Sequence, residues 1–250
     1  MGGAAGYAPS MTTSAGLVVA LDGPASSGKS SVGAAAAGRL GYRFCDTGLL
    51  YRAVTWLALR RQIDVADIGG LVALVGEVAL VSDASGRLAH VEVDGEDVTL
   101  VVHGPEVDVA VSAVSRVGPL RAALLERQRA IAAAGRIIMA GRDIGTVVLP
   151  DADLKLFLDA SVEERAARRI EERGLAPGDP AAAEILAQLR RRDDLDTSRA
   201  VAPLRIAPDA VVIHTDGNAF ETTVGLVVDV IQARAAGGSR PDPAGLRTGA

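Results

Sequence analysis

The chain has 250 residues, of which 49 % are hydrophobic and 23 % are charged, a composition typical of a globular protein and not of a disordered one. A single cysteine, Cys45, excludes a disulfide framework and any metal site built on several cysteines. The formal net charge of −5 argues against a protein that coats nucleic acid. Apolar runs fall short of the roughly 20 residues that cross a bilayer, and residues 1–15 lack the pattern of a signal peptide. We expect a cytoplasmic protein without membrane or nucleic-acid partners.

Strand-like and helix-like segments alternate along most of the chain. Strands are predicted at 17–21, 42–45, 136–140, 154–158 and 210–214. Helices are predicted at 29–40, 49–61, 120–134, 162–173 and 219–235. The strand segments are continuously apolar, as in parallel strands buried on both faces. The pattern predicts an α/β fold of three layers around a five-stranded parallel sheet.

Local signals add detail to this plan. Ser161 with Glu164, and Asn218 with Glu221, have capping-box spacing and predict two helix starts. Residues 80–101 alternate around turn sequences at 84–86 and 94–95 and predict a small antiparallel insert.

The sequence also suggests where the domain begins and ends. Residues 174–180 are rich in glycine and proline and predict a turn between two charged helices, which would form a helical lid. We expect disordered tails at 1–15 and 235–250, and one domain at 16–234.

Residues 23–30 match the phosphate-loop pattern G-x-x-x-x-G-K-[ST], directly after a predicted strand and before a predicted helix. Gly23 and Gly28 let the main chain bend so that its N–H groups surround an anion. Lys29 would reach the β- and γ-phosphates, and the Ser30 hydroxyl would coordinate Mg²⁺. The residues expected to bind ATP are Gly23, Pro24, Ala25, Ser26, Ser27, Gly28, Lys29, Ser30 and Ser31.

Several classes of phosphate-loop protein are disfavoured. A GTPase normally carries an N-K-x-D element, and the only other lysine, Lys155, lies in D-L-K-L-F. The length leaves little room for a motor or a transporter. A small-molecule kinase instead needs arginines around a charged acceptor. Such residues follow predicted strands at Arg52 and Arg142, and they follow the predicted lid at Arg192 and Arg199. Isolated arginines are interpreted as solvated surface residues, namely Arg165, Arg173, Arg190, Arg234 and Arg240.

Three further motifs carry a resemblance. D-T-G-L-L-Y-R at 46–52, G-R-D-I-G-T-V-V-L-P-D-A-D at 141–153 and R-R-D-D-L-D-T-S-R-A-V-A-P-L at 191–204, together with the phosphate loop, resemble bacterial cytidylate kinases across about 17–232. The resemblance implies a P-loop nucleoside monophosphate kinase that transfers the γ-phosphoryl group of ATP to CMP or dCMP with Mg²⁺. It also implies an acceptor-binding insert at about 64–111 and a lid at about 165–192, in a chain expected to act as a monomer.

The resemblance assigns roles residue by residue. The residues implied to face cytosine are Thr47, Ser112, Arg121 and Asp143. Those implied at the acceptor phosphate are Tyr51, Arg52 and Arg142, and those at the ribose and phosphates are Arg192, Asp196 and Arg199. The catalytic set would be Lys29, Arg142, Arg192 and Arg199, with Arg168 and Arg169 as further lid contacts to the donor.

The implied base contacts make chemical sense. A carboxylate at Asp143 and a hydroxyl at Thr47 can accept from the cytosine N4 amine, while Arg121 can donate to N3 and O2. Uracil reverses this edge and would leave buried charges unpaired, so a preference for CMP over UMP is expected. No general base is needed, because a phosphomonoester is already anionic near pH 7.

Two departures from the family pattern keep alternatives open. Ala140 stands where the family usually has an acid, and Leu49 where a small residue is common. Asp22 has two equally favoured interpretations: it caps the end of a strand, or it helps to hold the metal ion. The alternative functions are a P-loop kinase of another small acceptor and a catalytically weak nucleotide-binding module.

Overall fold

The computed structural model describes residues 16–176 and 178–238. The predicted tails therefore lie outside the described residues except for 235–238, and Ala235 is the last residue of helix α8. Within the described residues, no helix is both long enough and apolar enough to span a membrane.

Parallel strands form the centre of one sheet, in the order β2-β6-β1-β7-β8. Their bounds are Val18–Asp22 for β1, Arg43–Asp46 for β2, Ile137–Gly141 for β6, Leu154–Asp159 for β7 and Val211–His214 for β8. The register aligns Val19 of β1 with Ile138 of β6 and with Leu154 of β7. The five-stranded parallel core expected from the apolar runs is confirmed.

The antiparallel insert belongs to the same sheet. Its strands are β3 (Val78–Ser82), β4 (Arg87–Val93) and β5 (Glu96–Asp97). Strand β4 pairs in parallel with β2 and so joins the insert to the parallel core, with β3 beyond it. Among the described residues the sheet thus has eight strands. The predicted turn at 94–95 is confirmed, with positive φ angles of 53° at Asp94 and 81° at Gly95.

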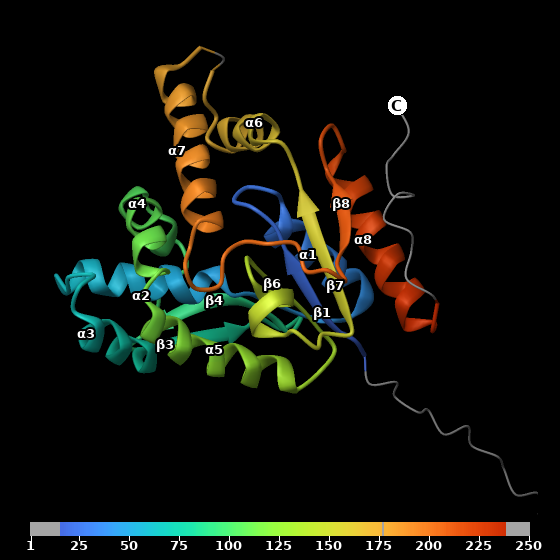
Figure 1. The fold of residues 1–250 in the computed structure, drawn as a ribbon, viewed down its shortest axis with the longest axis horizontal. Helices are drawn as coiled ribbons and strands as arrows, with labels where there is room; N and C mark the ends of the chain where they lie inside the picture. The colour runs from blue at the N-terminus through green and yellow to red at the C-terminus, as the bar shows by residue number, and fades with distance from the viewer. Residues whose placement is uncertain (1–15, 177, 239–250) are drawn as a thin grey trace, which may run out of the picture.

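Helices cover both faces of the sheet (Figure 1). On one face, α1 (Lys29–Leu40) and α8 (Phe220–Ala235) pack against apolar side chains of β1, β6, β7 and β8. On the other face lie α5 (Gly118–Ala133) and a single π-helical turn, η3 (Ile144–Val148). The expected three-layer fold is confirmed, and its buried apolar surface is the main stabilising contribution.

The insert carries its own small core. Helix α2 (Gly48–Arg60) packs with α3 (Ile68–Ala73) and α4 (Pro105–Val114) over β3 and β4. Short 3-10 turns, η1 (Leu74–Glu77) and η2 (Val101–His103), join these pieces. The cluster brings α4 close to α2, whose first turn borders the phosphate loop.

Helices α6 (Val162–Glu172) and α7 (Pro180–Thr197) stand beyond the carboxyl ends of the strands, with α7 above α4 in Figure 1. Ala166, Ile185 and Leu189 pack with Ala25 of the phosphate loop. This cluster places the two helices over the site.

The two predicted helix starts differ in outcome. The Ser161 cap is confirmed, because its side chain accepts from the Glu164 N–H. The Asn218 cap is wrong, because α8 begins one residue later, with Ala219 as its N-cap. The Asn218 side chain instead donates to the His214 carbonyl over 3.1 Å.

Candidate active site

The phosphate loop joins β1 to α1 in a conformation that depends on its glycines. A side chain at Gly23 would put its Cβ atom 2.4 Å from the Leu158 carbonyl oxygen, so the main chain requires glycine there. Gly28 has a φ of 85°, the left-handed region that glycine adopts without strain. The loop therefore leads directly into the N-terminus of α1, where main-chain amides and the helix dipole favour an anion.

Lys29 is buried at the first position of α1, and its Nζ donates to the Pro24 carbonyl over 2.9 Å. Burial, aided by the nearby Arg142 guanidinium, holds the pKa of Lys29 well below its ordinary value. A phosphate group beside the ammonium would stabilise its charged form. The lysine is thus poised to bind an anion.

Ser30 and Asp46 form an oxygen pair beside the loop. The Ser30 Oγ donates to the Asp46 Oδ2 over 2.5 Å, and the other carboxylate oxygen accepts from the Gly48 N–H. Hydroxyl and carboxylate oxygens are the hard ligands that Mg²⁺ prefers. In the described part of the chain no cluster of three metal-ligating acids, histidines or cysteines occurs. A hydroxyl and a carboxylate together suit a Mg²⁺ ion that is also held by phosphates and water. Asp46 was not among the predicted site residues, although it directly follows a predicted strand and begins the D-T-G-L-L-Y-R motif.

Two connected cavities lie at the carboxyl ends of the strands. The larger, about 770 Å³, is lined by loop residues 25, 26 and 28–31 and by side chains of α4, α6 and α7. The smaller, about 70 Å³, adjoins it and shares Arg52, Arg142 and Arg192. The structure brings together at this smaller cavity all ten predicted acceptor residues: Thr47, Tyr51, Arg52, Ser112, Arg121, Arg142, Asp143, Arg192, Asp196 and Arg199. Gly23, Pro24 and Ser27 support the loop without lining either cavity.

A buried ion pair stands at the inner end of the smaller cavity. Arg121 of α5 donates to the Asp143 carboxylate over 2.5 Å, and its guanidinium lies 5.4 Å from the Tyr51 ring centroid. Thr47 donates to the Ala140 carbonyl over 2.9 Å, and its oxygen keeps acceptor capacity. The cavity thus ends in one charged donor and two oxygen acceptors.

Asp196 is a second buried carboxylate of the smaller cavity. Its carboxylate accepts from Arg142 Nε over 2.9 Å and also from Arg199. Burial alone would raise the pKa of Asp196, but the attraction of Arg142 and Arg199 outweighs it and the pKa lies below its ordinary value. Asp196 therefore remains ionised and fixes two guanidinium groups.

Arg192 carries excess positive charge in this region. Burial, with repulsion from Arg142 and Arg52, lowers its pKa to about 10. Its Nε is buried and has no hydrogen-bond partner within the described residues. Three arginines converging on one cavity with an unsatisfied donor make an anion site.

Asp22, at the end of β1, positions the segment that bears Arg142 and Asp143. Its carboxylate accepts from the Ile144 and Gly145 N–H groups, each over 2.8 Å. Burial raises its pKa to about 6 despite these bonds. Of the two interpretations left open, the structure favours the cap, which holds the start of the π-helical turn.

Some interpretations of single residues are wrong or incomplete. Arg165, interpreted as a surface residue, is buried and donates to the Ala25 carbonyl over 3.1 Å and to Asp193, because α6 packs this face against the loop. Arg173 lies 3.5 Å from Asp108, an α4 carboxylate that our sequence analysis missed.

The structure also places Arg168 and Cys45, two other residues with a predicted role. Arg168 donates to the Thr215 carbonyl over 2.5 Å. Arg240 lies outside the described residues. Cys45 is buried, and burial raises the pKa of its thiol to about 12, as expected for a small apolar residue.

A phosphate loop after β1, beside an arginine-lined pocket at neighbouring strand ends, defines a kinase of the P-loop class. A family model described as cytidylate kinase matches residues 19–233. A cytidylate kinase of Rhodococcus opacus is 47 % identical, covering 90 % of this chain and 98 % of the relative. A cytidylate kinase of Nocardia farcinica is 47 % identical, over 85 % of this chain and 90 % of the relative. A cytidylate kinase of Geobacillus thermodenitrificans is 43 % identical, over 87 % of this chain and 97 % of the relative. The chain belongs to the cytidylate kinase family.

Proposed function

We propose that this protein transfers the γ-phosphoryl group of ATP to CMP or dCMP, giving CDP or dCDP and ADP. The observation that supports this most directly is the buried Arg121–Asp143 pair in an arginine-lined cavity, next to a larger cavity that the phosphate loop lines. Membership of the cytidylate kinase family supports the same assignment.

The donor would lie along the phosphate loop. Main-chain amides of residues 23–31 and the Lys29 ammonium would hold its β- and γ-phosphates. Ser30 and Asp46 would hold Mg²⁺, which supplies charge neutralisation between the phosphates when bound. Asp46 pairs in register with Ala140, so a carboxylate already lies beside the position where the family's usual acid is missing. This arrangement favours an active kinase over a binding module.

The acceptor would fill the smaller cavity with its base inward. Asp143 and Thr47 would accept from the N4 amine, and Arg121 would donate to N3 and O2. Ser112, which is buried and lines both cavities, would complete the base end.

The acceptor phosphate would lie toward the donor. Arg52, Arg142 and Arg192 line both cavities, so a phosphate bound to them would face the phosphate loop. Tyr51 would border it, while Asp196 and Arg199 would contact the sugar.

Phosphoryl transfer here requires charge cancellation and exclusion of water. The acceptor oxygen is already anionic near pH 7, so the chain needs no general base. Lys29 and the three arginines would offset repulsion between the two nucleotides and stabilise charge on the transferring group. The lid, at about 165–192, would cover the site together with the insert at about 64–111 and keep water out.

We also propose that the protein is cytoplasmic and that it acts as a monomer.

Steady-state kinetics with ATP and a panel of acceptors tests the proposal. CMP and dCMP should turn over at roughly 1–100 s⁻¹, the usual range for kinases, with UMP and AMP much slower. Small hydroxy acids belong in the panel, because turnover of one of them without CMP would identify a kinase of another acceptor. Binding of CMP without turnover would instead identify a nucleotide-binding module.

A further inference from the structure

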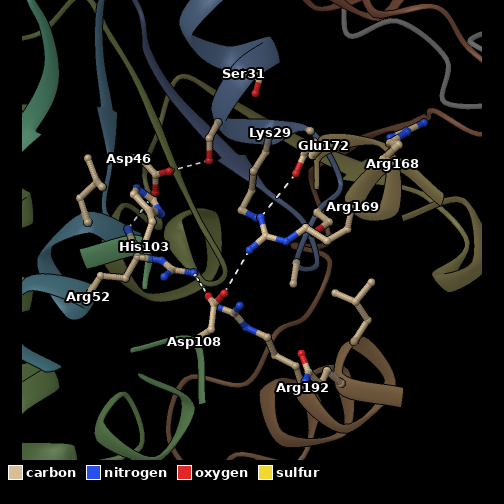
Figure 2. A pocket seen from close by; sticks show the side chains of 18 of the residues that line it. Lys29, Ser31, Asp46, Arg52, His103, Asp108, Arg168, Arg169, Glu172 and Arg192 are labelled. Carbon is tan, nitrogen blue, oxygen red and sulfur yellow. Dashed lines mark hydrogen bonds and ion pairs between the residues drawn. The ribbon is translucent and has the colours of Figure 1, made fainter. Parts of the chain in front are cut away.

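One carboxylate lies among the arginines of the larger cavity. Asp108, on α4, accepts from Arg52 over 2.6 Å, and its second oxygen lies 3.1 Å from Arg169 and 3.5 Å from Arg173. Figure 2 shows Asp108 between the guanidinium groups of Arg52 and Arg169, with Arg192 nearby. The Asp108 side chain is only 15 % exposed. It is therefore a built part of the cavity and not a surface charge.

These contacts connect three separate parts of the fold. Arg52 belongs to α2 and Asp108 to the insert, whereas Arg169 and Arg173 lie on α6 and directly after it. One carboxylate thus holds the lid side of the cavity against the insert side.

The charges around Asp108 are not balanced by it. Its single negative charge faces Arg52, Arg169 and Arg173, and Arg192 also attracts it. Glu172 pairs with Arg169 over 3.4 Å, so the cluster of four arginines and two carboxylates still carries excess positive charge. Two carboxylate oxygens bound by separate guanidinium groups reproduce part of what a phosphate group offers, and a dianionic phosphate would pair with these arginines more completely. Asp108 and an acceptor phosphate therefore compete for Arg52.

We propose that Asp108 is an internal competitor of the acceptor phosphate: it occupies Arg52, and through Arg169 and Arg173 holds the lid to α4, until the acceptor displaces it. The inference rests on the proposed function, because that function assigns Arg52 to the acceptor phosphate. Displacement frees the two α6-side arginines at the moment when the acceptor arrives. Only ligands that carry a phosphate have to displace Asp108, so a nucleoside without one is unaffected.

The test removes the charge of Asp108 while keeping its size. The fraction of molecules with Arg52 available sets the apparent affinity, so Asp108→Asn should lower both the KM and the equilibrium Kd for CMP about three- to tenfold. The inhibition constant of inorganic phosphate against CMP should fall by a similar factor. That of cytidine should stay within about twofold.

Glu106→Gln is the matched control, because Glu106 is exposed in the first turn of the same helix and loses the same charge. Its constants should match the wild type. Asp108→Ser serves as a second variant if Asp108→Asn does not fold, as judged by its melting temperature.

Three results would overturn the proposal. An unchanged Kd for CMP would mean that Asp108 does not compete, and a higher Kd would mean that it positions Arg52 for the phosphate. If the inhibition constant of cytidine fell as much as the Kd for CMP, the substitution would have changed the cavity in general. Failure of the proposed function looks different: the wild type would not phosphorylate CMP, while inorganic phosphate binding would still report on Asp108.

Discussion

The phosphate loop and the acceptor pocket both suit negatively charged groups, but they are built in opposite ways. The loop is one continuous segment, bent at Gly28 and followed by one buried lysine. The pocket collects side chains from α2, α4, α5, α7 and the turn after β6, and it pairs many of its charges internally. Arg121 binds Asp143, and Arg142 binds Asp196.

This difference separates affinity from selectivity. A ligand at the loop would supply countercharge to the main-chain amides and Lys29, and this interaction does not depend on the base that the polyphosphate carries. A ligand in the pocket has to satisfy charges that already have partners. A mismatched ligand leaves a buried charge without a partner, at a cost of about 1–3 kcal/mol or more. We therefore expect loop variants to change rate and pocket variants to change substrate choice.

The largest effect is expected at the loop. Lys29→Ala should lower kcat by roughly 10²–10³-fold, as does the loss of one preorganised donor to a transition-state charge in other enzymes. The CMP/UMP selectivity should change little, as measured by coupled assay with both acceptors. Arg39→Gln, at the other end of α1 and paired with Glu221 at the surface, is the control and should keep wild-type kinetics. Wild-type turnover in Lys29→Ala would refute its role.

A second variant probes Asp22, which joins the two regions. Because burial raises the pKa of Asp22 in the folded protein to about 6, above the ordinary value of 3.8, the neutral form favours folding, and this contribution is lost as pH rises through 6. Between about pH 4.5 and 7.5, wild type should lose about 2 kcal/mol of unfolding free energy relative to Asp22→Asn. Urea denaturation at both pH values measures the difference. Parallel behaviour of the two proteins would show that Asp22 does not titrate there.

The pocket itself is tested at its inner ion pair. Asp143→Asn should reduce the ratio of kcat/KM for CMP over UMP by roughly tenfold to a hundredfold, because the acceptor of the N4 amine loses its charge. The KM for ATP should stay within about twofold. Asp151→Asn, at an exposed carboxylate shortly after the same segment, serves as the control. Unchanged selectivity would remove Asp143 from base recognition.

The smallest effect is expected at Ala140. Its carbonyl accepts from Thr47, and the residue lies opposite Asp46 in the sheet. Ala140→Asp should lower the Kd for Mg²⁺ about two- to fivefold, since a second carboxylate would join Asp46. Calorimetric Mg²⁺ titration in the presence of ATP measures this, with Ala140→Asn as the uncharged control. Equal values for the two variants would mean that the missing acid is unimportant.

Sequence patterns predicted the central sheet and the phosphate loop well, but they predicted few of the contacts between residues far apart in the chain. Continuous apolar runs predicted all five parallel strands, because a strand buried on both faces leaves that signal locally. The insert strands were also predicted, but their junction with β2 was not, since pairing depends on neighbours far along the chain. The cap at Asn218 failed because Ala219 took the N-cap position.

The amino-acid sequence alone determined the phosphate loop and the positions of the predicted strands, and it predicted which residues would meet at the smaller cavity, because these depend on contiguous motifs. Only the tertiary structure decided the partners of those residues. Arg165 reaches the Ala25 carbonyl, Asp22 caps a turn more than a hundred residues away, and Asp108 faces Arg52. The physical reason is that helix packing chooses which face of an amphipathic segment is buried, and a charged residue's role follows from that choice.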